Sequence, residues 1–132
     1  MNKILTLMLA VVSNCATAEW VEVDATVGRD VNGALYADPT TIVRSGDMVQ
    51  MSILTDLKIA KKSSKGDIKS IKKQDEFDCN KKQWQTLSYS MYAANMGKGG
   101  VIYSSVKPQS LNPVGEDGST SGMLWGIACG RQ

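Results

Sequence analysis

MVQMSILTDLKI, residues 48–59, is the stretch that decides the fold. Its odd-numbered positions lie on one face of an extended chain and are almost all apolar: Val49, Met51, Ile53, Thr55, Leu57 and Ile59. A period of two is typical of a β-strand with one face buried. The turn residues Ser45-Gly46-Asp47 come directly before it. We therefore expect a long strand that packs its odd-numbered face on a core.

Turns and shorter strands flank this stretch. On the N-terminal side, alternation over residues 20–24 and the Asn32-Gly33 signal predict a hairpin, which breaks at Asp38-Pro39. A β-branched stretch at 41–43 follows. On the C-terminal side, the polar, lysine-rich residues 60–66 predict a loop. Further strands are expected at 68–79, 84–92 and 101–106, with a glycine-rich turn at 95–100 and irregular chain around Pro108 and Pro113.

The C-terminal residues change to a helical period. Ser119 or Thr120 can cap a helix that ends near Gly130. Its apolar positions recur at spacings of three to five: Met123, Leu124, Ile127 and Ala128. Gly122 and Gly126 weaken the helix, so it needs tertiary support. The fold class that follows is α+β, an antiparallel sheet of five or six strands with one C-terminal helix packed on it.

The N-terminus resembles a secretory signal. Lys3 is its only charge, residues 4–12 are apolar, and Ala16-Thr17-Ala18 forms an Ala-x-Ala cleavage site. Nine apolar residues are too few to span a hydrocarbon core about 30 Å thick, and no other segment qualifies as transmembrane. We expect a signal peptide at 1–18 and a single soluble domain at 19–132, with 14 basic and 13 acidic residues in that domain.

Cys15 offers a competing processing signal. A cysteine after an apolar run can become the acylated first residue of a lipoprotein, but such a cysteine normally follows Gly, Ala or Ser, and here it follows Asn14. The two alternatives predict different mature termini, Glu19 or a lipidated Cys15.

Two cysteines, Cys79 and Cys129, remain once Cys15 is removed. In an oxidising compartment we expect them to pair and to tie the helix to the sheet. A closed loop of about 50 residues stabilises a fold by roughly 4 kcal/mol in the chain-entropy treatment. A redox-active pair would favour Cys-x-x-Cys spacing, which is absent.

Several short motifs follow one another along residues 20–130: Trp20, Tyr36-Ala37-Asp38-Pro39-Thr40-Thr41-Ile42, Arg44-Ser45-Gly46, Asp78-Cys79, Gly97-Lys98-Gly99-Gly100 and Ala128-Cys129-Gly130. In their order and spacing they resemble the surface-adhesin protein E family of Gram-negative envelope proteins. The resemblance implies an antiparallel sheet with a C-terminal helix, a disulfide between Cys79 and Cys129, and an adhesin that binds host extracellular matrix. The family's namesake is lipid-anchored, whereas the Ala-x-Ala site here favours a soluble product.

The sequence contains few residue patterns that are typical of an enzyme. The chain has no histidine, which removes histidine-based triads and metal ligands. The cluster Asp75-Glu76-Asp78 is better explained as a solvated strand face, and the glycines of 97–100 precede a strand and not the helix that a phosphate loop needs. The sequence therefore predicts no catalytic residues, no cofactor and no metal.

Lysines form the candidate binding site. Residues 58–73 hold seven of them and one acid, Asp67: Lys58, Lys61, Lys62, Lys65, Lys69, Lys72 and Lys73. They predict affinity for anionic macromolecules such as matrix proteins or sulfated glycans, or else simply a solubilising loop that protects a sheet edge. Nucleic acid is disfavoured because no aromatic residue lies in the run.

Two functions remain open from the sequence. The first is an adhesin-like surface protein, and the alternative is a periplasmic accessory protein, either an inhibitor or a small-ligand binder. Oligomeric state is also open, a homodimer included.

Overall fold

A twisted antiparallel sheet with one helix forms the fold of the computed structural model, which describes residues 18–23 and 32–130. Most of the expected signal segment, residues 1–17, and Asp24 of the first expected strand lie outside these ranges. The strands are β1 (Val21–Glu22), β2 (Gly33–Ser45), β3 (Met48–Ser63), β4 (Gly66–Asp78), β5 (Gln83–Tyr92), β6 (Val101–Ser105) and β7 (Asn112–Pro113). A short 3₁₀ turn, η1 (Asn95–Gly97), follows β5, and the helix is α1 (Thr120–Cys129).

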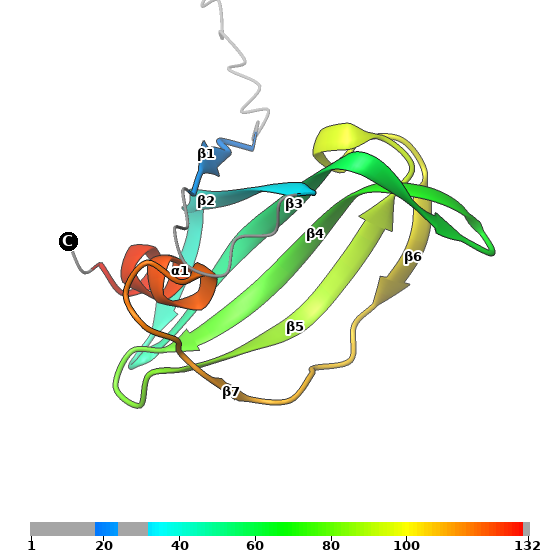
Figure 1. The fold of residues 1–132 in the computed structure, drawn as a ribbon. Coiled ribbons are helices and arrows are strands. Elements are labelled where there is room, and N and C mark those ends of the chain that lie inside the picture. The colour runs from blue at the N-terminus through cyan, green and yellow to red at the C-terminus, as the bar shows by residue number, and fades with distance from the viewer. Residues whose placement is uncertain (1–17, 24–31, 131–132) are drawn as a thin grey trace, which may run out of the picture.

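The first six strands form a meander in which each strand pairs with the next in the sequence. Its order is β1-β2-β3-β4-β5-β6, and β7 pairs with β5 (Figure 1). Four strands have ten or more residues, β6 has five, and β1 and β7 have two each. The α+β class and the C-terminal helix are confirmed. β7 was not expected, because Pro113 indicated irregular chain; proline is tolerated in an edge strand, where no partner needs its missing N–H.

The predicted break at Asp38-Pro39 is wrong, because β2 runs through it with a bulge. The register of β2 on β3 shifts between Asp38 and Val43. Asp38 holds this bulge: its carboxylate accepts hydrogen bonds from the N–H and hydroxyl of Thr40, and its carbonyl oxygen accepts one from the Thr41 hydroxyl at 2.6 Å. These local hydrogen bonds hold the chain where the register shifts and where Pro39 has no N–H to donate.

The predicted loop at 60–66 is also wrong. β3 continues to Ser63, a two-residue turn follows, and β4 starts at Gly66, whose positive φ of 128° suits a glycine. Lys62 lies opposite Asp67 in this hairpin. The polar composition reflects exposure to solvent on both faces and not a lack of strand pairing, which is why the pattern indicated a loop.

The main core lies between α1 and one face of the sheet. Val49, Met51, Ile53 and Phe77 are at most 1% exposed, and α1 contributes the three buried residues of its inner side, Leu124, Trp125 and Ala128. The expected alternation therefore holds along the first part of β3. It fails at Ile59, which is 73% exposed, because the β3–β4 register breaks between Asp56 and Lys61.

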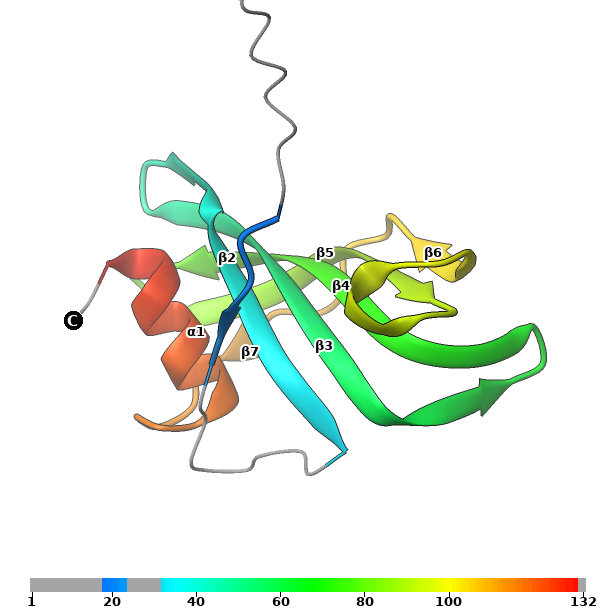
Figure 2. The ribbon, with the colours of Figure 1, turned by 90° about the horizontal axis from the view of Figure 1, so that it is seen from above.

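The opposite face is covered at the other end of the sheet by the segment around η1. In both ribbon views this segment and α1 lie at opposite ends of the sheet (Figures 1 and 2). The buried Ser70 hydroxyl donates to the carbonyl of Ala94 and accepts the N–H of Gly97, while Asp56 accepts the N–H of Met96. Leu54, which lies on this face, has no exposed surface. The glycine-rich turn thus joins β5 to β6, as expected.

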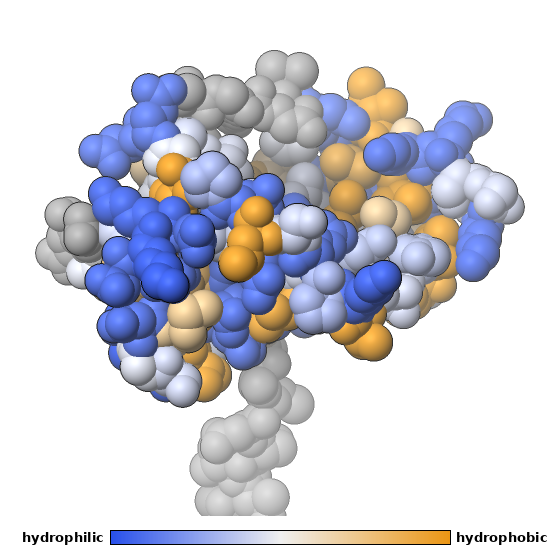
Figure 3. Space-filling model, turned by 90° about the horizontal axis from the view of Figure 1, so that it is seen from below, coloured by the Kyte–Doolittle hydropathy of each residue, from blue (hydrophilic) through white to orange (hydrophobic). Residues whose placement is uncertain are grey.

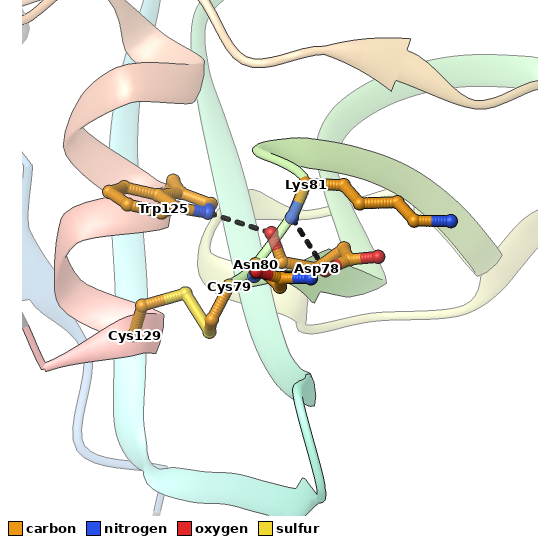
Figure 4. Close-up of a disulfide and its surroundings, with 6 residues drawn as sticks. All are labelled: Asp78, Cys79, Asn80, Lys81, Trp125 and Cys129. Carbon is orange, nitrogen blue, oxygen red and sulfur yellow. Dashed lines mark hydrogen bonds between the residues drawn. A yellow bond between two sulfur atoms is a disulfide. The ribbon is translucent and has the colours of Figure 1, made fainter.

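A disulfide fixes α1 to the end of β4. The Cys79 and Cys129 sulfurs are 2.07 Å apart, which confirms the expected bridge (Figure 4). The Trp125 indole N–H also donates to the Asp78 carbonyl at 3.0 Å. Ser119 caps the helix by accepting the N–H of Gly122, as the sequence indicated.

Candidate functional site

The lysine-rich hairpin projects beyond the strands on either side of it. β2 pairs with β3 only as far as Leu57, and β5 pairs with β4 only as far as Ser70. Residues 58–69 therefore extend as a two-stranded arm, the green hairpin at the right of Figure 1. We call these residues the basic arm.

The arm carries five of the seven predicted lysines and splits them between its two faces. Cross-strand pairing places Lys62 opposite Asp67 and Lys61 opposite Ile68. Because side chains alternate along a strand, Lys62 and Lys69 lie on one face and Lys61 on the other. Lys58 lies where the register breaks, and Lys65 lies in the turn. All five are exposed, so the arm presents positive charge in several directions.

The tip of the arm lies close to β6. The Lys65 ammonium is 5.5 Å from the ring centre of Tyr103, and a Cβ placed on Gly66 would be 3.4 Å from the Ile102 side chain. Tyr103 is 45% exposed and Val101 58%. Figure 3 shows hydrophilic side chains at this end of the molecule next to hydrophobic ones. The tip thus combines charge with apolar and aromatic surface.

The remaining two lysines lie in the body of the sheet, on opposite faces. Lys72 lies over the ring of Trp20, 5.9 Å from its centre, beside a cavity of about 220 Å³. Lys73 lines a different cavity, on the side of α1. The structure does not bring all seven lysines into one patch.

The cavity beside Lys73 lies between α1 and the sheet and has a volume of about 370 Å³. Its walls are mostly apolar, and its polar groups include Lys73 and Asp75. Asp75 is 2% exposed and accepts a hydrogen bond from Thr86 at 2.8 Å. Burial raises the pKa of the Asp75 carboxyl above its ordinary value, and the Thr86 bond and the Lys73 charge offset part of that rise.

The three carboxylates of the 75–78 cluster do not converge. Asp75 is buried beneath α1, Glu76 accepts a hydrogen bond from Gln85, and Asp78 accepts the backbone N–H groups of the turn that follows β4. Sequence reasoning placed the whole cluster on a solvated face and missed Asp75. A period of two counted back from Phe77, which is fully buried, would have placed Asp75 on the core face.

Within residues 18–23 and 32–130, no group of three or more acidic, cysteine or histidine side chains is placed to hold a metal ion. In the same ranges no helix has the length and apolar character to cross a membrane.

Comparisons with known proteins agree on one fold. The family profile described as surface-adhesin protein E matches residues 20–130. Haemophilus influenzae protein E has a similar structure, with a TM-score of 0.65 and 15% identity over 86% of each chain. The structure of its crystal form II has a TM-score of 0.58 and 13% identity, and the match covers 83% of this chain and 96% of that one. The structure of its selenomethionine form has a TM-score of 0.59 and 12% identity, and the match covers 83% of this chain and 95% of that one.

Among curated proteins, no sequence matches this chain. At 12–15% identity the likeness to protein E shows a shared fold. The profile match over residues 20–130, together with the helix, the bridge and the meander described above, shows that the chain belongs to the surface-adhesin protein E family.

Proposed function

We propose that this chain is an exported, non-enzymatic surface adhesin, made with a signal peptide at 1–18 and a binding domain at 19–132. Membership of the surface-adhesin protein E family supports this role. Among the described residues, Asp75, Glu76 and Asp78 do not converge on a common point, and each accepts a hydrogen bond from a neighbouring strand or turn. We therefore propose a structural role for these carboxylates. The ligand class is an anionic macromolecule, such as a host matrix component.

The basic arm is the proposed binding element, and its projection beyond the sheet is the observation that carries the proposal. Residues 58–69 hold five lysines and one acid, and neither β2 nor β5 pairs with them. A two-stranded ribbon with lysines on both faces can place ammonium groups around a linear polyanion. Attraction of this kind accelerates association and weakens as the salt concentration rises.

Charge reversal tests the arm. In the variant Lys61→Glu/Lys62→Glu/Lys65→Glu/Lys69→Glu, binding to immobilised matrix protein or heparin should fall at least tenfold, and the salt dependence of the remaining binding should flatten. A matched control is Lys98→Glu/Lys107→Glu, which reverses two exposed lysines outside the arm and should bind like the wild type. Both proteins are compared at several salt concentrations, after circular dichroism has shown that they are folded.

Two further variants test whether both faces contribute. Lys62→Glu/Lys69→Glu alters one face of the arm, and Lys61→Glu alters the other. A ligand that the arm engages on both sides loses affinity in each variant. If the variant with all four Lys→Glu substitutions bound as tightly as the wild type, the arm would not be the binding element.

A small-ligand binder is the second candidate, and the cavity beneath α1 favours it. At about 370 Å³ it falls within the size range of ligand sites, roughly 300–1,000 Å³, and its mostly apolar wall with a few polar groups is typical of such sites. Native mass spectrometry of protein purified from its own cell envelope would reveal a retained small molecule. Protease treatment of intact cells separates the two candidates further, because only a surface protein is cleaved.

A further inference from the structure

The carboxylate of Asp38 lies beside the predicted cleavage site. Asp38 is 2% exposed, and its Oδ2 atom accepts the backbone N–H of Glu19 at 3.0 Å. Its Oδ1 atom accepts the N–H and hydroxyl of Thr40. Glu19 follows Ala18, the last residue of the Ala-x-Ala site, and Ala18 is exposed. Within the described residues 18–23, the bond to this buried acid therefore comes from the nitrogen that cleavage would release.

A buried carboxylate is costly unless positive charge or several hydrogen bonds compensate it. The hydrogen bonds that the Asp38 carboxylate receives from described residues come from neutral groups, two amides and a hydroxyl. Lys72 lines the same small cavity, but its ammonium lies over the Trp20 ring. A positive charge on the Glu19 nitrogen would turn one neutral bond into a charge-assisted one, which is about twice as strong.

We propose that cleavage between Ala18 and Glu19 creates an α-ammonium group that pairs with Asp38 and locks the mature N-terminus onto the β2 bulge. Hydrolysis adds the hydroxyl of a water molecule to the Ala18 carbonyl carbon and a proton to the Glu19 nitrogen. The resulting amine takes up a second proton near neutral pH. The inference rests on the cleaved signal proposed above.

Only this cleavage position places the charge at Asp38. Processing at Cys15 would leave the Glu19 nitrogen inside a peptide bond, so its hydrogen bond to Asp38 would stay neutral. The lock acts on the fold because the Asp38 carbonyl accepts the Thr41 hydroxyl, which in turn accepts the N–H of Ser52 on β3 at 2.9 Å. Maturation thus tightens the contact between the N-terminus and the bulge that sets the β2–β3 register.

A double-mutant cycle tests the pair in proteins with defined termini. One protein starts at Glu19 and the other at Ala18, so the second has an amide in place of the ammonium. Each is made with Asp38 and with Asp38→Asn, which keeps an oxygen for the Thr40 bonds. In the Asp38 background the Glu19 start should lower the unfolding equilibrium constant about tenfold. In the Asp38→Asn background the two starts should differ less than about twofold. Equal differences in both backgrounds overturn the proposal.

Glu22→Gln is the matched control, because it removes a nearby exposed carboxylate that has no bond to the terminus. It should leave the tenfold effect in place. If Asp38→Asn does not fold, the pairing is tested instead by the pKa of the α-amine in the wild-type protein that starts at Glu19. This pKa is measured by the pH dependence of reductive methylation of the amine. The charged groups near it are Asp38, Lys72 and the exposed side chain of Glu19 itself. Pairing raises this pKa above its ordinary range of about 7.7–8.0, and an unshifted value refutes the pair.

N-terminal sequencing of the protein exported from its own full-length chain tests the processing step separately. The expected first residue is Glu19. A mature protein that begins at a lipidated Cys15 refutes the cleavage, whatever the cycle shows. A Glu19 start without coupling to Asp38 leaves export intact and refutes only the lock.

Discussion

Removal of the Cys79–Cys129 bridge should cost about 4 kcal/mol of unfolding free energy. The bridge joins residues 50 positions apart, and closing a loop of that length lowers the entropy of the unfolded chain by about 14 cal/mol/K in the chain-entropy treatment. At 25 °C this corresponds to about 4 kcal/mol, a large share of the 5–15 kcal/mol typical of a domain. The double variant Cys79→Ala/Cys129→Ala tests the value without adding polar groups.

Urea unfolding followed by tryptophan fluorescence measures the loss. With a slope of about 1.5–2 kcal/mol/M, the midpoint should fall by roughly 2–3 M. The slope itself should not decrease, because the inner side of α1 is buried in the main core and should unfold together with the sheet. Reductant should move the wild type to the midpoint of the variant and leave the variant unchanged.

A loss below about 1 kcal/mol with an unchanged slope would refute the loop argument. A smaller slope would instead show that α1 detaches on its own and that the bridge, not the core, keeps it in place.

Three further predictions concern stability, each measured by urea unfolding. The pKa of the Asp75 carboxyl is raised in the folded protein, so the free energy of unfolding falls as pH rises through that pKa. The variant Asp75→Asn lacks this fall. The stability of the variant relative to the wild type should therefore increase with pH. Gly122→Ala should destabilise the protein by more than about 1 kcal/mol, because the new Cβ would lie 2.2 Å from the Glu116 carbonyl oxygen, while Gly100→Ala, with nothing within 4 Å, should be neutral. Ser70→Ala should cost about 1–3 kcal/mol and increase amide exchange around η1, because two backbone groups lose their partner; unchanged exchange there would contradict this role.

Sequence periodicity predicted the elements that bury one face. The alternation from Val49 to Ile53 and the helical spacing of Leu124 and Ala128 both identify residues of the main core, because each pattern reports directly on burial. The pairing of Cys79 with Cys129 followed from compartment and count alone.

Features that depend on backbone pairing or on both faces of the sheet were harder to predict. Residues 60–66 looked like a loop because a hairpin end exposed on both faces has no apolar period, and its strands are defined by pairing such as that of Lys62 with Asp67. Leu54 lies on the polar face of the alternation, yet it is buried by a segment more than 40 residues later. The seven lysines are close together in sequence, but their division between the arm and the body of the sheet depends on the strand register, which composition alone does not reveal.

The position of α1 after all the strands in the sequence has a consequence for the order in which the protein can fold. Strands β2 to β5 pair with sequence neighbours, so they can assemble as successive hairpins while the chain emerges N-terminus first during the proposed export. Their apolar face stays uncovered until α1 emerges, and α1 also carries Cys129, the partner of Cys79. A chain that is still being translocated therefore exposes the apolar face of the sheet, which is prone to aggregation. A factor that shields this face during translocation would raise the yield of folded protein.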